Sequence, residues 1–220
     1  MSRLRNLSLF LVLAAVWGSA FVAIKAGLAY FPPVLFAAFR FDVAGLVMLS
    51  YAAYAVDDPV PRGRDQWLEV VSGAVFIIAA YHAFLFVGET DPAVTSGVAA
   101  VIVSLSPLLT TVFARAFLPA ERLTAVGALG LGIGLVGAVV LANPDPANLT
   151  GGGTVAKLLV LLAAASFALG SVLSRASEAD IPIETMEAWS MLLGAGIIHV
   201  VALALGESVA DAVWTTESLL

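Results

Sequence analysis

The sequence predicts an all-α integral membrane protein, a polytopic bundle of about seven transmembrane helices. Of its 220 residues 61% are hydrophobic and only 12% are charged, and its mean hydropathy is +1.02. Apolar runs recur at the length of about 20 residues that a helix needs to cross a hydrocarbon core about 30 Å thick. A transmembrane barrel would show alternating segments of about 10 residues, whereas these runs are continuously apolar. We therefore expect helices throughout.

Short connections containing Pro or Gly separate the expected spans. The first span follows a basic N-terminus, and its apolar run is longer than that of a cleaved signal peptide, which predicts an uncleaved helix. The expected spans are residues 7–29, 33–56, 67–88, 92–113, 123–142, 154–174 and 185–206.

Basic residues in the connections set the orientation. On the side of the N-terminus lie Arg3, Arg5, Arg62, Arg64, Arg115, Arg122 and Arg175, whereas the other side carries only Lys157. Because basic residues are enriched on the inner side, the N-terminus is expected in the cytoplasm and the chain in the plasma membrane as a multi-pass protein. Below, inner and outer refer to this orientation.

An internal repeat is the second feature of the organisation. Residues 143–153, the longest outer connection, separate a five-helix unit (1–142) from a shorter segment (154–220). At an offset of 150 residues, AAVWGSAFVAIK (14–25) aligns with AASFALGSVLSR (164–175), with three identical positions. Because five is odd, a second copy would enter the membrane from the opposite side, which predicts an inverted repeat whose second copy is incomplete.

Several of these segments resemble the EamA-type branch of the drug/metabolite transporter superfamily: WGSAF (17–21), PPVLFAAFR (32–40), SLSPLLT (104–110) and LPAERLTAVGALGLGIGLVGAVVL (118–141). The resemblance is strong over residues 1–142 and looser over 154–206. It implies ten helices in two inverted five-helix repeats that move small metabolites through a central cavity. This sequence departs from that pattern because it lacks three C-terminal helices.

Charged and polar residues inside the expected spans are the candidate site. Arg40 lies seven residues after Pro33, about 10 Å deep, where a charge costs on the order of 2.5 to 3.5 kcal/mol, so a partner or a wet cavity is expected. Asp42 points to another side of the same helix. Tyr81 and His82 reach a similar depth in the third span.

Lys25 lies near the outer end of the first span, where its long side chain either extends to the surface or joins the other polar residues. Together Lys25, Arg40, Tyr81 and His82 would form a weakly basic pocket for a carboxylate or zwitterionic solute; structural ion pairing and hydrogen-bonded packing are the alternatives. Trp17, followed by small residues, is interpreted as a pathway wall or as a close helix contact.

Pro107 in the fourth span predicts a kink, which serves either gating or shape. The two histidines, His82 and His199, have no carboxylate cluster or metal-binding motif near them in the sequence, so no metal and no cofactor are expected.

The leading functional prediction is a secondary transporter that moves a small metabolite, such as an amino acid or a related organic solute, by alternating access. We expect a lipid bilayer and a small solute as partners, and leave proton or sodium coupling and homo-oligomerisation open. The net charge of -6 without a basic cluster excludes nucleic acid. Two alternatives remain: a truncated, non-transporting partner subunit, and an intramembrane hydrolase using Ser96 with His82 or His199. We do not expect an enzyme, because no motif organises that trio.

Overall fold

Helices form every regular element in the parts of the chain that the computed structural model describes, residues 3–118, 124–142 and 152–215. They are α1 (Arg3–Gly27), α2 (Pro33–Ala55), α3 (Arg64–Ser72), the π-helix η1 (Gly73–Ala80), α4 (Tyr81–Glu89), α5 (Ser96–Val103), α6 (Ser106–Phe117), α7 (Ala125–Ala142), α8 (Gly152–Ala176), α9 (Ile183–Ala204) and the short 3₁₀-helix η2 (Val209–Asp211). The prediction of an all-helical polytopic fold is confirmed.

Six helical segments of the described chain are long and apolar enough to cross a membrane. Two of them are composite: α3, η1 and α4 form one span over Arg64–Glu89, and α5 with α6 forms another over Ser96–Phe117. Helix α7 covers the remaining expected span, 123–142, and has 18 residues. The chain is therefore a multi-pass membrane protein.

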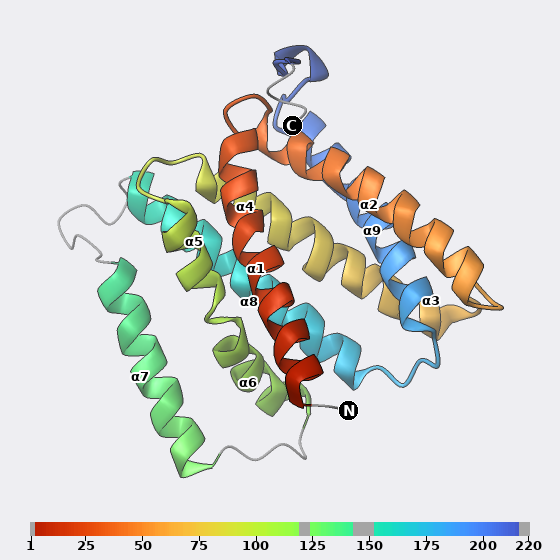
Figure 1. Cartoon of the computed structure of the whole chain (residues 1–220), viewed down its shortest axis with the longest axis horizontal. Helices are drawn as coiled ribbons and strands as arrows, with labels where there is room; N and C mark the ends of the chain where they lie inside the picture. Colours follow the sequence, from red (N-terminus) through yellow and green to blue (C-terminus); the bar gives the residue numbers. More distant parts are fainter. Residues whose placement is uncertain (1–2, 119–123, 143–151, 216–220) are drawn as a thin grey trace.

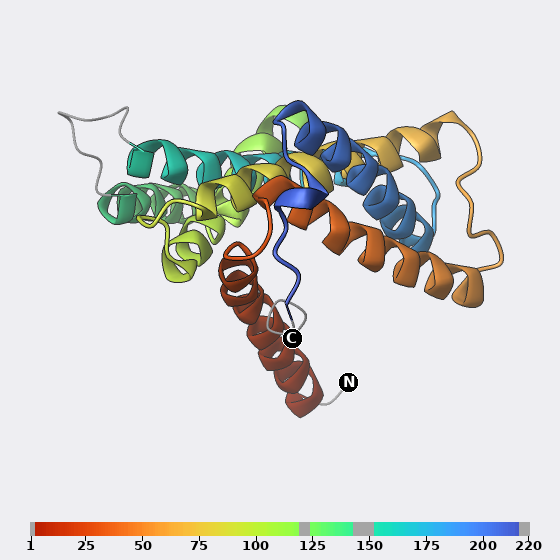
Figure 2. The same cartoon turned by 90° about the horizontal axis from the view of Figure 1, so that it is seen from above.

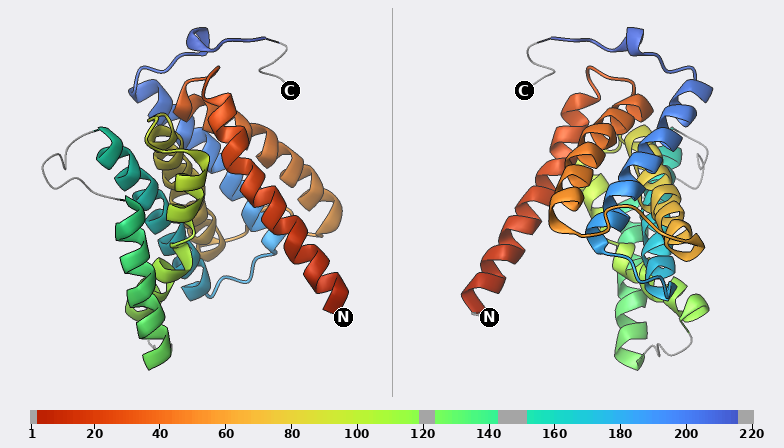
Figure 3. Two further views of the ribbon diagram at one scale, coloured as in Figure 1. Left: turned by 60° about the vertical axis from the view of Figure 1, so that its left-hand side comes forward. Right: turned by 90° about the vertical axis from the view of Figure 1, so that its right-hand side faces the viewer.

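The helices are packed very unequally (Figure 1). Helix α2 lies along α9, and the α3–η1–α4 span lies against α8 and α9. Helix α1 instead leaves the layer formed by the others (Figure 2) and diverges from them toward its N-terminal end (Figure 3). Only 6% of the α1 span is buried, against 44% of Arg64–Glu89. The well-packed centre is thus the α3–η1–α4 span.

The π-helix lies at this centre, and two glycines allow neighbouring helices to approach it closely. A Cβ atom added to Gly170 of α8 would lie 2.7 Å from Ile77 Cγ1, and one added to Gly194 of α9 would clash with Ile78. The Ser166 hydroxyl donates to the carbonyl oxygen of Phe76 at 2.8 Å. Small residues and hydroxyl donors at helix crossings are typical of membrane bundles. No sequence pattern predicted this π-helix, which ends at Ala80, directly before Tyr81.

The fourth span is interrupted immediately before Pro107. Helix α5 ends at Val103, and α6 begins at Ser106 with the proline in its first turn. Proline has no N–H group to donate to the preceding turn. The hydroxyl of Ser106 donates to the Val103 carbonyl at 2.7 Å instead.

The helices that the predicted repeat would pair resemble each other in length or in how they begin. Helices α1 and α8 each contain 25 residues. Pro32 (φ −55°, ψ 136°) precedes α2 and Pro182 (φ −57°, ψ 136°) precedes α9, an offset of 150 residues. In Figure 1, α1 ascends from the N-terminus whereas α8 descends from the upper left.

Candidate functional site

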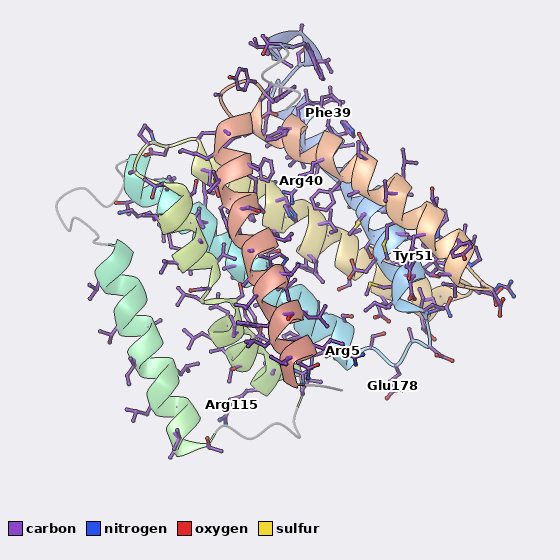
Figure 4. All side chains as sticks on the ribbon, viewed as in Figure 1. Arg5, Phe39, Arg40, Tyr51, Arg115 and Glu178 are labelled. Carbon is purple, nitrogen blue, oxygen red and sulfur yellow. The ribbon has the colours of Figure 1, made fainter. Side chains whose placement is uncertain are left out.

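Among the charged residues of the predicted site, Arg40 is the one whose side chain has no hydrogen bond or ion pair with another described residue. Its guanidinium carbon lies 5.8 Å from the centre of the Phe41 ring, and it interacts electrostatically with Tyr81 of α4. Arg40 is exposed, and no residue in the described chain forms a hydrogen bond or an ion pair with it. In Figure 4 its side chain lies between the ribbons of α1 and α2 and over α4. An arginine at this depth normally has a partner.

Tyr81 and His82 begin α4, directly after the π-helix. The His82 ring is buried, lies 4.3 Å from the ring of Phe41, and has Nδ1 within 2.8 Å of the Ile78 carbonyl oxygen. The Tyr81 ring lies 4.4 Å from His82 and 5.4 Å from Phe167 of α8. The structure thus brings Arg40, Tyr81 and His82 together around Phe41. His82 is engaged in packing, whereas the open polar groups are those of Arg40 and Tyr81.

Lys25 is bound by backbone rather than by this group. Its ammonium donates to the carbonyl of Glu89, to that of Asp91 at 3.2 Å and to that of Val94 at 3.0 Å. An ammonium has three donors, so all of them are used. Lys25 therefore attaches α1 to the α4–α5 connection, and no contact joins it to Arg40 among the residues described.

Asp42 and His199 form a separate pair between α2 and α9. His199 Nε2 lies 2.8 Å from Asp42 Oδ2, and the two side chains are 34% and 40% exposed. The Phe39 ring packs 5.8 Å from that of His199. Because Asp42 follows Arg40 by two residues, it faces away from the Tyr81 side of α2. Sequence reasoning did not predict this pair, because the two residues are 157 positions apart.

Trp17 and Ser96 lie outside this group. Trp17 is 63% exposed on the poorly packed part of α1. The Ser96 hydroxyl donates to the Phe21 carbonyl at 3.2 Å, so it contacts α1 rather than a histidine. Among the described residues, Ser96 therefore forms no hydrogen bond with His82 or His199 that could activate it as a nucleophile.

Glu89 was missed by sequence reasoning, which assigned it to the turn-rich GETDP segment (88–92). It is the last residue of α4 and is 0% exposed. Neither of its carboxylate oxygens has a hydrogen-bond partner, and it interacts electrostatically with Lys25 and Tyr81. One signal was present: Glu89 follows Tyr81 by eight residues, about two helical turns, so both share one face.

Two surface pockets lie away from these residues. One of about 400 Å³ lies between α6 and α7 beside Arg115, and one of about 380 Å³ lies between α3, η1 and α8 beside Glu69. At the second pocket the hydroxyls of Ser174 and Ser177 donate to the two Glu69 oxygens at 3.0 and 2.9 Å. Its carboxylate is therefore fully hydrogen-bonded, unlike that of Glu89.

Comparisons with known proteins agree with this architecture. Residues 5–143 match the EamA-like transporter family. An uncharacterized transporter of Archaeoglobus fulgidus is 33% identical over 61% of this chain and 46% of its own length. A WAT1-related, chloroplastic protein of Arabidopsis thaliana is 33% identical over 81% and 42%. The uncharacterized inner membrane transporter YedA of Escherichia coli K12 is 32% identical over 85% and 58%. The chain spans about half the length of these relatives. No solved structure matches it.

Proposed function

Because the chain belongs to the EamA-like transporter family, we propose that it is a secondary transporter that carries a small organic anion or zwitterion, such as an amino acid, across the plasma membrane by alternating access. Membership supports transport as the activity, and the multi-pass helical fold supports a route between helices. No catalytic role is assigned, because Ser96 and both histidines have other partners.

The observation that carries this proposal is the open guanidinium of Arg40. A planar guanidinium matches a carboxylate with two parallel hydrogen bonds. Arg40 has neither a hydrogen bond nor an ion pair within the described chain, and the aromatic rings of Phe41 and Tyr81 lie beside it. A solute carboxylate would supply the missing negative charge, and the rings would contact its apolar part.

The inverted repeat is the proposed basis of the movement. Residues 1–142 would form one five-helix unit, residues 143–153 a linker and residues 154–220 part of a second unit. Equal lengths of α1 and α8 and the paired prolines before α2 and α9 support this division. Trp17 and Asp42 are kept as pathway residues, and the break before Pro107 is proposed as a hinge.

A second candidate is a subunit that works only with another chain or a second copy. It is favoured by two observations: the chain spans about half the length of its relatives, and only 6% of the α1 span is buried. Crosslinking in native membranes, followed by measurement of the mass of the complex, tests it. A monomer that transports solute when reconstituted would exclude this candidate.

Reconstitution in proteoliposomes tests the main proposal. Labelled amino acids, other carboxylates and their neutral analogues are offered to the wild type, to Arg40→Gln and to the control Arg62→Gln, whose side chain is 74% exposed in a connection. We expect the wild type and the control to accumulate the same carboxylate-bearing solute, and Arg40→Gln to lose uptake. Uptake no higher than in protein-free vesicles for every solute would overturn the proposal.

A further inference from the structure

Three glutamates of this chain differ sharply in how their carboxylates are satisfied. The Glu69 oxygens accept from two serine hydroxyls. The Glu207 oxygens accept the backbone N–H groups of Val34 and Leu35, at 3.2 and 2.7 Å, at the start of α2. Glu89 is fully buried, and neither of its oxygens accepts a hydrogen bond. Its environment therefore needs an explanation that the other two do not.

Lys25 places a positive charge near the Glu89 carboxylate but donates no hydrogen bond to it. All three ammonium donors are turned to backbone carbonyls, and one of those carbonyls belongs to Glu89 itself. The two residues interact electrostatically, yet the carboxylate is left without a donor. A buried ionised carboxylate is costly unless it is hydrogen-bonded, and binding a proton removes its charge.

A metal ion suits this site less well than a proton. Hard cations such as Mg²⁺ and Ca²⁺ need about six oxygen ligands. Nowhere in the structured ranges do three or more His, Asp or Glu side chains gather. The three carbonyls beside Glu89 already accept from Lys25. A single proton on one Glu89 oxygen needs no further ligand.

Tyr81 begins the helix that Glu89 ends. It lies on the same face of α4 as Glu89, and its hydroxyl interacts electrostatically with both Glu89 and Arg40. The ionisable residues on α4 and on the elements packed against it, besides Glu89 itself, include Arg5 and Lys25 of α1, Arg40, Asp42, Tyr51 and Tyr54 of α2, Tyr81 and His82 of α4, Lys157 and Arg175 of α8, and Asp91 of the following connection. Among these, Lys25 and Tyr81 interact with Glu89.

We infer that Glu89 is the proton-binding residue that couples transport to a proton gradient, an inference that rests on the proposed transport function. A proton from the outer solution binds one Glu89 oxygen and neutralises that carboxylate. Arg40 binds the carboxylate of the solute. On the inner side the solute leaves and the Glu89 O–H bond releases its proton to water. One proton thus crosses with each solute molecule.

Labelling with an apolar carbodiimide tests the proton site without knowledge of the solute. Such reagents modify a protonated carboxyl group inside a membrane, and the adduct is located by mass spectrometry of the peptide. We expect labelling of Glu89 to increase as the pH is lowered, and Glu69 to stay unlabelled. Absence of labelling at Glu89, or labelling that does not vary with pH, would overturn the inference.

Gradient-driven uptake tests the coupling. For the solute found in proteoliposomes, uptake is measured with and without an inward proton gradient in the wild type, in Glu89→Gln and in the control Glu69→Gln. We expect the gradient to increase uptake several-fold in the wild type and the control, and to have no effect in Glu89→Gln. If the gradient has no effect on the wild type, coupling is refuted while transport stands. If Glu89 labels with pH dependence and no solute is taken up, the proton site stands while the proposed transport function fails.

A second variant separates a proton role from a packing role. Glu89→Asp keeps a carboxyl group in a shortened side chain, whereas Glu89→Gln keeps the size and removes the titration. We expect Glu89→Asp to regain part of the response to the gradient. A response retained in Glu89→Gln would show that the carboxyl group acts only in packing and would overturn the inference.

Discussion

Polar side chains near the two ends of the α3–η1–α4 span differ in their hydrogen bonding. At the inner end, Glu69 accepts from Ser174 and Ser177, and the Trp189 indole donates to the Pro59 carbonyl at 2.9 Å. In the outer half, the guanidinium of Arg40 and the carboxylate of Glu89 have no hydrogen-bond partner in the chain as described. Both regions contain charge beside apolar helices. The inner groups therefore stabilise helix contacts, whereas binding of the solute and of a proton is the role proposed for the outer groups.

Lys25→Met should have the largest effect on stability, because it removes the ammonium that attaches α1 to the α4–α5 connection. Three carbonyls would lose their donor, and Glu89 would lose its countercharge. Breaking one partner of a buried pair typically costs about 3 to 5 kcal/mol. We expect a loss near the lower end, measured by unfolding in detergent.

The double variant Lys25→Met with Glu89→Gln sharpens this prediction. If Lys25 compensates the Glu89 charge, the double variant should lose less stability than the sum of the two single variants. Strict additivity would show that Lys25 acts through the carbonyls alone.

Arg40→Gln should affect uptake more than stability. Loss of the charge-assisted contact with a solute carboxylate should reduce the rate of uptake at least about tenfold, or about 1.4 kcal/mol. The free energy of unfolding should stay within about 0.5 kcal/mol of the wild type, because no hydrogen bond or ion pair within the described chain is lost. Parallel uptake and unfolding measurements check this. A destabilised Arg40→Gln with normal uptake would mean that Arg40 is structural.

Glu69→Gln should show the reverse behaviour with a smaller magnitude. One carboxylate oxygen becomes an amide NH2 group that cannot accept from a hydroxyl, and the other loses its charge, so we expect a loss of about 1 kcal/mol in the free energy of unfolding. Uptake per folded protein should be unchanged. A transport defect in Glu69→Gln would contradict the assignment of a purely structural role to the inner end.

Ser166→Ala should have the smallest effect. It removes the hydroxyl that donates to Phe76 in the π-helix, and such bonds between membrane helices contribute ~0.6 kcal/mol on average. A much larger loss would indicate that this bond maintains the π-helix on which the placement of Tyr81 depends.

Sequence reasoning succeeded where depth and apolar length decide the outcome. The helices follow from run length, and Arg40, Tyr81 and His82 meet because all three lie at a similar expected depth. It failed where a partner is set by packing. The acceptors of Lys25 are backbone carbonyls, which carry no sequence signal. Asp42 and His199 are 157 residues apart, so their pairing depends on how α2 and α9 cross.

Glu89 and the π-helix were missed for different reasons. Glu89 closes an apolar run just before Thr90 and Asp91, so composition assigned it to a surface turn. Its burial is a result of tertiary packing, and at this end of α4 the helix α8 lies so close that a Cβ atom added to Gly88 would lie 2.7 Å from Val160 Cγ2. The change from α- to π-helix over Gly73–Ala80 is a matter of backbone hydrogen bonding, to which hydrophobic periodicity is insensitive.

The most direct test of the account compares binding of a transported carboxylate with binding of its neutral amide. Calorimetric affinities of both compounds are measured for the wild type and for Arg40→Gln. If Arg40 receives the solute carboxylate, the wild type should prefer the acid and the variant should bind the two compounds equally. The same preference for the acid in both proteins would contradict the account.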